Sequence, residues 1–154
     1  MYFPDLTEGK YFGLSVGWLD RAHDYPRGPV PAGFLEALGV AGHNCAVRHK
    51  GSHICELCPS PQWAAAGSCR ELPDGTRLTM GNGVIRVWSR SGKAYVAPNL
   101  IYHYVEVHKY QPPTEFIEAV MSPGPPGRVH LTAMQMEGFF RFFSYGLTRF
   151  PPKE

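Results

Sequence analysis

The alternation of apolar and polar positions is clearest between residues 76 and 97. Three short runs, Thr76 to Met80, Val84 to Trp88 and Lys93 to Ala97, have the residue types that β-strands favour. The stretches that separate them, Gly81-Asn82-Gly83 and Ser89-Arg90-Ser91-Gly92, have the composition of tight turns. The pattern therefore predicts a small antiparallel β-meander in the middle of the chain.

Helical patterns flank this meander on both sides, with Pro and Gly at their boundaries. The expected helices run from near Pro31 to Gly39, from Asn99 to about His108, from about Pro113 to Met121, and from Thr132 to about Tyr145. Val16 to Leu19 has the composition of a strand, whereas residues 41–70 show little periodicity. We therefore predict an α+β fold, in which the small antiparallel β-meander packs with short helices and a metal-organised loop.

Composition and charge limit the classes of partner. Lys and Arg number 15 and Asp and Glu 13, which is too balanced to favour nucleic acid or a membrane surface. No stretch approaches the ~20 apolar residues of a membrane-spanning helix. The first residues also lack the basic start and apolar core of a signal peptide. We therefore expect a cytoplasmic location, where four Cys serve better as metal ligands or free thiols than as disulfides.

Candidate chemistry is concentrated in residues 41–70, which hold all four Cys. Cys55 and Cys58 have the two-residue spacing of a zinc knuckle, and His53 can add an imidazole from the same loop. Three such ligands within six residues suit Zn²⁺ much better than Mg²⁺ or Ca²⁺. The alternatives are a redox pair or buried free thiols. A redox pair should open a long helix, whereas Pro-Ser-Pro follows at residues 59–61.

A closed zinc site needs a fourth ligand, and His103 is the preferred residue. It lies on the first turns of the helix that follows the meander, where a loop beside the sheet can meet it. His108 lies five residues later, which turns a helix by ~500°, so the two side chains should point ~140° apart. The open alternatives are Cys69, His108, Cys45, His49 or a water molecule. The expected metal ligands are therefore His53, Cys55, Cys58 and His103.

The chain divides into a domain and a tail. We expect residues 1–121 to form a single α+β zinc-binding domain. Residues 122–154 read as a Pro/Gly linker and a C-terminal aromatic helix packed on the same domain. This helix would carry one apolar stripe, which could instead join two copies of the chain as a homo-oligomer: Met136, Phe139, Phe140, Phe143 and Leu147.

Several motifs resemble an uncharacterised family of small bacterial proteins. One is Gly51-x-His53-x-Cys55-x-x-Cys58, and another runs from His103-Tyr-Val through His108-x-Tyr110 to Pro112-Pro113. Tyr2-Phe3-Pro4-Asp5-Leu6 and Val16-Gly17-Trp18-Leu19 extend the resemblance to the first residues, so it covers roughly residues 1–121. The resemblance places the His and Cys residues inside a shared pattern and implies no particular activity.

Three functions are compatible with these features. The first is a protein-interaction or regulatory/accessory module with a structural zinc, whose partner is a protein. A closed zinc site can contribute ~10–16 kcal/mol to the folded state of such a loop-rich chain. The second is a hydrolase-like zinc enzyme with an open coordination position and Glu56 or Glu106 as the acid/base.

The third function is a nucleic-acid-binding module. Arg86, Trp88, Arg90 and Lys93 would form its stacking and phosphate-binding surface on one hairpin. A solvated sheet face explains the same residues more simply. Dispersed Lys and Arg and the absence of an RNA-module signature also disfavour this alternative.

Overall fold

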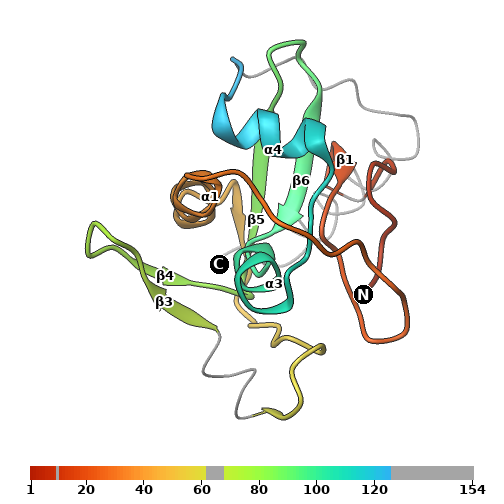
Figure 1. The fold of residues 1–154 in the computed structure, drawn as a ribbon, viewed down its shortest axis with the longest axis vertical. Coiled ribbons are helices and arrows are strands. Elements are labelled where there is room, and N and C mark those ends of the chain that lie inside the picture. The colour runs from red at the N-terminus through yellow and green to blue at the C-terminus, as the bar shows by residue number, and fades with distance from the viewer. Residues whose placement is uncertain (10, 62–67, 126–154) are drawn as a thin grey trace, which may run out of the picture.

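A computed structural model describes residues 1–9, 11–61 and 68–125. In this part of the chain a four-stranded sheet has the order β1 (Leu14–Ser15), β6 (Ala94–Pro98), β5 (Gly83–Trp88) and β2 (Val47–Arg48). β1 runs parallel to β6, whereas the β6–β5 and β5–β2 pairs are antiparallel. The sheet is therefore mixed, and the long β5–β6 hairpin forms its centre (Figure 1).

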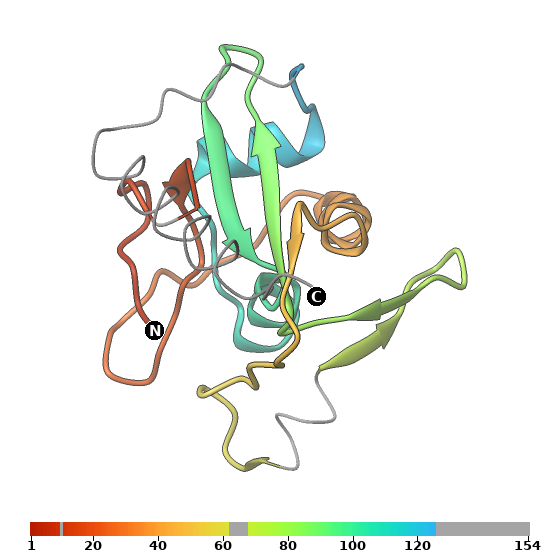
Figure 2. The same cartoon turned by 180° about the vertical axis from the view of Figure 1, so that it is seen from behind.

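Helices cover one face of this sheet. They are α1 (Phe34–His43), α3 (Ile101–His108) and α4 (Thr114–Met121), and Figures 1 and 2 place them together on the same side. Fully buried apolar side chains from each helix and from β5 fill the space between the layers: Phe34, Leu38, Ile85, Ile101 and Phe116. The predicted α+β class is confirmed, and its short elements depend on this shared core for stability.

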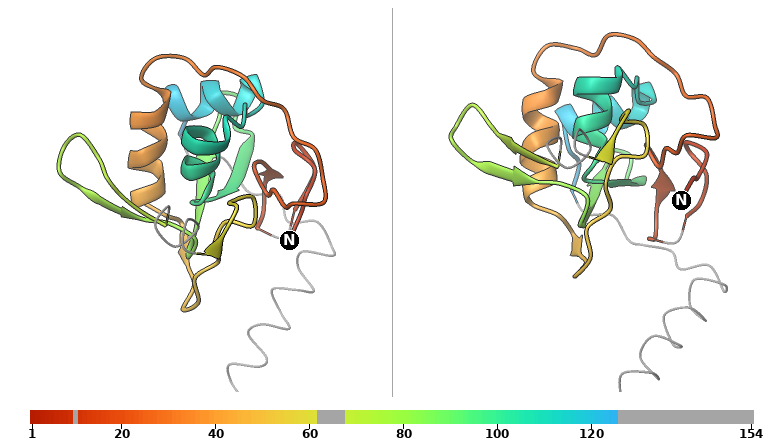
Figure 3. Two further views of the ribbon diagram at one scale, coloured as in Figure 1. Left: turned by 60° about the horizontal axis from the view of Figure 1, so that its bottom comes forward. Right: turned by 90° about the horizontal axis from the view of Figure 1, so that it is seen from below.

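A second, two-stranded sheet extends away from the body of the domain (Figure 3). It pairs β3 (Cys69–Glu71) with β4 (Arg77–Thr79) in antiparallel register. The expected three-stranded meander is therefore wrong in one pairing, because the first of its three runs joins β3 instead of β5.

The cause lies in the segment Gly81-Asn82-Gly83, which is not a simple hairpin turn. The buried Asn99 accepts the amide protons of Gly81 and Gly83 at Oδ1, at 2.7 and 3.2 Å. Its Nδ2 donates to the Thr79 carbonyl at 2.9 Å. The Gly81 and Gly83 amides and the Thr79 carbonyl are therefore bonded to Asn99 and are not available for a hairpin between β4 and β5.

The predicted helices are confirmed at three positions. α1 begins later than expected and continues past Gly39, where a Cβ atom would lie 2.8 Å from Leu72. Gly39 is thus required for close packing and does not end the helix.

The strand expected at Val16 to Leu19 lies two residues earlier, and the helix expected at residues 132–145 lies outside the described residues. Within the described ranges, no helix has the length and apolar character needed to cross a membrane.

Candidate metal centre

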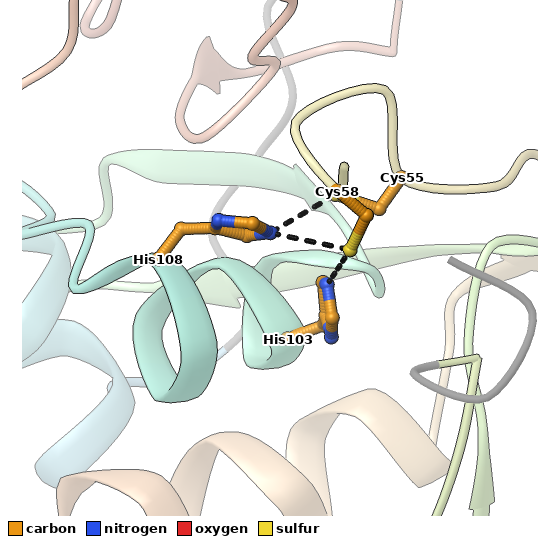
Figure 4. A group of neighbouring side chains, drawn as sticks. All are labelled: Cys55, Cys58, His103 and His108. Atoms are coloured by element: carbon orange, nitrogen blue, oxygen red, sulfur yellow. Dashed lines mark hydrogen bonds between the residues drawn. The ribbon is translucent and has the colours of Figure 1, made fainter. Parts of the chain in front are cut away.

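Four side chains from two distant segments converge beside the sheet (Figure 4). Cys55 and Cys58 come from the loop between β2 and β3, and His103 and His108 come from α3. Their ligand atoms all lie within 4.8 Å of one another. Cys58 Sγ is 3.2 Å from His103 Nε2 and 3.5 Å from His108 Nε2, and Cys55 Sγ is 3.3 Å from His108 Nε2.

These separations fit a tetrahedral metal ion. Zinc bond lengths of ~2.3 Å to sulfur and ~2.0 Å to nitrogen place an S and an N of one tetrahedron about 3.5 Å apart. The observed S···N distances of 3.2, 3.3 and 3.5 Å lie close to that value. Cys55, Cys58 and His103 are each 3% exposed, so the protein already shields most of the site from water. The donor set of two thiols and two imidazoles is typical of structural zinc.

The backbone of the Cys55–Cys58 knuckle is held in place by Arg21. Its Nε donates to the Glu56 carbonyl at 2.9 Å, and a terminal nitrogen donates to the Cys58 carbonyl at 3.0 Å. These bonds connect the N-terminal segment to the loop between β2 and β3. Groups that fix ligand-bearing backbone in this way usually tune metal affinity as outer-shell partners.

The α3 side of the site explains why both histidines reach it. His108 is the last residue of the helix, and Lys109 adopts a left-handed conformation with φ 56°. Helical side chains lean toward the N-terminus, so the His108 imidazole returns toward the turn that carries His103. The ring centroids lie 5.0 Å apart. The expectation that the two side chains point ~140° apart is therefore wrong, because it counted helix rotation and neglected side-chain reach.

Burial sets the protonation of the free side chains. It lowers the pKa of His103 to about 4, with a smaller contribution from His108, so the imidazole is neutral and can donate its lone pair. Burial also lowers the pKa of His108 and raises the pKa of the Cys55 thiol to about 12, which hydrogen bonds from the Leu57 and Cys58 amides partly oppose. Binding of a divalent cation must therefore release the proton of Cys55.

Comparison with protein families identifies one match, which covers residues 1–121. The chain belongs to the family of DUF7919, a domain of unknown function. All four residues of the Cys2His2 cluster lie inside the matched range. No curated protein and no solved structure matches the chain.

Within this DUF7919 domain, His53 lies outside the cluster although it was an expected ligand. Its Nε2 faces Glu56 Oε1 at 3.4 Å, and its side chain is 52% exposed. Its backbone amide donates to the Gly81 carbonyl at 2.8 Å, which ties this residue to the sheet side of the loop. His108 stands in the cluster in its place, and the sequence analysis had kept it among the alternatives for the fourth ligand.

The other alternative ligands also have partners elsewhere. Cys45 Sγ donates to the Gly42 carbonyl at 2.9 Å, and Cys69 Sγ accepts from Arg77 Nε at 2.9 Å. His49 Nε2 lies 3.5 Å from the Tyr11 hydroxyl. None of the three belongs to the cluster that the described residues form.

Both carboxylates considered as an acid/base are engaged in ion pairs. Glu106 accepts from Arg70, including its Nε at 3.0 Å. Glu56 pairs with His53 and lies 3.9 Å from the amino group of Met1. Neither carboxylate is thus a free base aimed at the cluster. Cys55 and Cys58 also line a surface hollow of about 430 Å³.

The residues of the nucleic-acid alternative are bound within the DUF7919 domain. Arg86 donates to the Tyr11 carbonyl, and Arg90 donates to Ser122 Oγ at 2.6 Å. Lys93 lies 4.0 Å from Glu115. The Trp88 carbonyl accepts the Gly124 amide at 2.8 Å. The cations of this hairpin are therefore bonded to the protein and do not form a free phosphate-binding row.

Proposed function

We propose that this chain is a cytoplasmic zinc-binding module that acts in protein interaction, as a regulatory or accessory domain, with the zinc in a structural role. One observation carries the proposal, which is the convergence of two thiols and two imidazoles at tetrahedral spacing. Four protein ligands complete the coordination sphere of Zn²⁺ and leave no position for a substrate.

The cluster connects parts of the chain that are far apart in the sequence. Cys55 and Cys58 lie in a loop without regular structure, and His103 and His108 lie on a helix whose far side packs in the core. Because Arg21 binds the same loop, an ion at this site would tie together three segments. Coupling of this kind makes metal binding a large part of the folding free energy.

Catalysis has less support at this site. A zinc hydrolase keeps one coordination position for water and places a carboxylate nearby to move protons. Here Glu106 is paired with Arg70, and Glu56 is paired with His53. The geometry therefore favours a closed structural site over an open catalytic one.

The surface next to the cluster favours a protein partner. Ile54 and Val107 each precede a cluster residue in the sequence, and they are 42% and 44% exposed. Exposed apolar side chains on a metal-fixed loop and helix suit a protein interface better than the phosphate backbone of a nucleic acid. Arg86 and Arg90 form hydrogen bonds within the domain, which also favours a protein partner over a nucleic acid.

Two measurements test the proposal. Chelation of the metal from the reduced protein should cause cooperative unfolding, measured by circular dichroism. A fold that survives metal removal would contradict the structural role.

For the interaction, cross-linking in the source cells should give a reproducible protein adduct. An Ile54→Asp/Val107→Asp variant with unchanged zinc content and melting temperature should lose that adduct. Cross-links mainly to RNA, or an adduct that persists in the variant, would contradict the proposed interface.

A further inference from the structure

A cavity of about 360 Å³ lies beside the metal centre, between the N-terminal segment and the loop that precedes the knuckle. Tyr11, Trp18, His49 and His53 line it. Tyr104 of α3 also lines it, and its ring lies beside those of His103 and His108. Its volume falls within the ~300–1,000 Å³ of small-molecule sites. We infer that this cavity binds a planar heteroaromatic molecule of one or two rings.

The aromatic side chains form an ordered row. Trp18 and Tyr11 are stacked, with ring centroids 5.3 Å apart and planes inclined by 9°. Tyr11 continues to His49, at 6.0 Å between centroids. The Trp18 indole donates to the Val96 carbonyl at 3.3 Å, which fixes the ring beside Tyr11. Such a row favours a flat ring as a ligand, because offset stacking adds to the gain from apolar burial.

The polar part of the lining suits a ring that carries heteroatoms. Met1, whose amino group is charged, is among the lining residues, so the lining does not select against an ionised ligand. The imidazoles of His49 and His53 and the Ser52 hydroxyl supply donors and acceptors for a ring nitrogen or a hydroxyl group. These groups indicate a heteroaromatic ring over a plain hydrocarbon.

The wall of the cavity is fixed before any ligand binds. His49 and His53 donate their amide protons to the carbonyls of Asn82 and Gly81 at 2.7 and 2.8 Å. Asn99 in turn holds the Gly81 amide. A Cβ atom on Gly81 would lie 2.1 Å from the His53 carbonyl oxygen, so this close approach requires glycine. A preformed wall lowers the entropy cost of binding.

The experiment uses 5-fluoroindole as the probe and the full zinc-loaded chain. Fluorine NMR and calorimetry should show saturable binding, and the Trp18 indole signal should shift while that of Trp88 stays. Gly51 lines the cavity, and a Cβ atom there would meet nothing within 4 Å, so Gly51→Phe can fill the space without a clash. We expect this variant to weaken binding at least about tenfold. Ser91→Phe adds the same ring at the exposed far hairpin and should leave binding unchanged.

Three results would overturn the inference. The first is the absence of saturable binding and of any Trp18 shift in the wild-type chain. The second is equal affinity in Gly51→Phe at an unchanged melting temperature. The third is binding that appears only in a full-length Phe140→Ser/Phe143→Ser variant, which would show that the occupant is the chain's own tail. Because the zinc content is measured separately, these outcomes do not depend on the proposed function.

Discussion

The imidazoles of His103 and His108 lie edge to face across one turn and a half of α3, with their planes inclined by 73°. This relationship presents both Nε2 atoms to the knuckle that carries Cys55 and Cys58. A single short helix thus supplies half of the candidate coordination sphere, and the loop between β2 and β3 supplies the other half.

Replacing His108 should therefore affect zinc binding, whereas replacing His53 should not. We expect His108→Ala to lose most of its zinc and to lose more than about 4 kcal/mol of unfolding free energy, because a ligand is removed from metal-coupled folding. His53→Ala should keep about one zinc per chain. Elemental analysis and chemical denaturation check both variants. A His53→Ala protein that loses zinc while His108→Ala keeps it would reverse the assignment.

Two cysteines offer a matched pair for stability. Cys58→Ser should destabilise the fold by several kcal/mol, since the variant forfeits metal-coupled folding energy. Cys45 is half-buried, donates to the Gly42 carbonyl and also contacts Asn99, and serine keeps a donor of similar size there, so Cys45→Ser should cost about 1 kcal/mol. Thermal melting in the presence of zinc measures the difference. Equal melting temperatures would count against Cys58 as a ligand.

Arg21 should position the knuckle without touching the metal. Arg21→Gln removes the hydrogen bonds to the Glu56 and Cys58 carbonyls, so the apparent zinc affinity should fall by about tenfold while the ligand set stays the same. Arg90→Gln, which loses only a bond to Ser122 far from the cluster, is the control. Competition with a calibrated chelator gives both affinities. If the two variants bind zinc equally well, Arg21 has no positioning role.

Asn99 should be essential to the junction between the two sheets. It is fully buried and bonds to Gly81, Gly83 and Thr79, so Asn99→Ala leaves buried backbone groups unpaired. We expect a cost of about 1–3 kcal/mol or more. Asn82→Ala, in the same segment but partly exposed, should stay within about 0.5 kcal/mol of the wild type. Urea denaturation distinguishes them, and an unaffected Asn99→Ala protein would contradict this account.

The sequence predicted those features that depend on local pattern. The β5–β6 hairpin and helices α3 and α4 follow from turn residues and apolar spacing within short windows. The pairing of β4 with β3 could not be predicted in this way, because the Asn99 side chain that binds the Gly81 amide lies 18 residues further along the chain. His108 was ranked below His103 as a ligand because the rotation of an ideal helix takes no account of the length of the imidazole side chain.

The tail remains a prediction. We expect its aromatic helix to pack on the domain, so truncation after Pro126 should give an insoluble or molten product. Solubility and size-exclusion chromatography of the truncated chain check this. A folded, soluble monomer would instead assign the aromatic stripe to a partner or to a second copy of the chain.

X-ray absorption at the zinc edge tests the central claim most directly. The account predicts about one zinc per chain, bound by two sulfur atoms at ~2.3 Å and two imidazole nitrogens at ~2.0 Å. The His108→Ala variant should lose one nitrogen from this shell, and His53→Ala should give the wild-type spectrum. A folded wild-type protein without zinc, or a shell with only one imidazole and an oxygen from water, would contradict the closed Cys55, Cys58, His103 and His108 site.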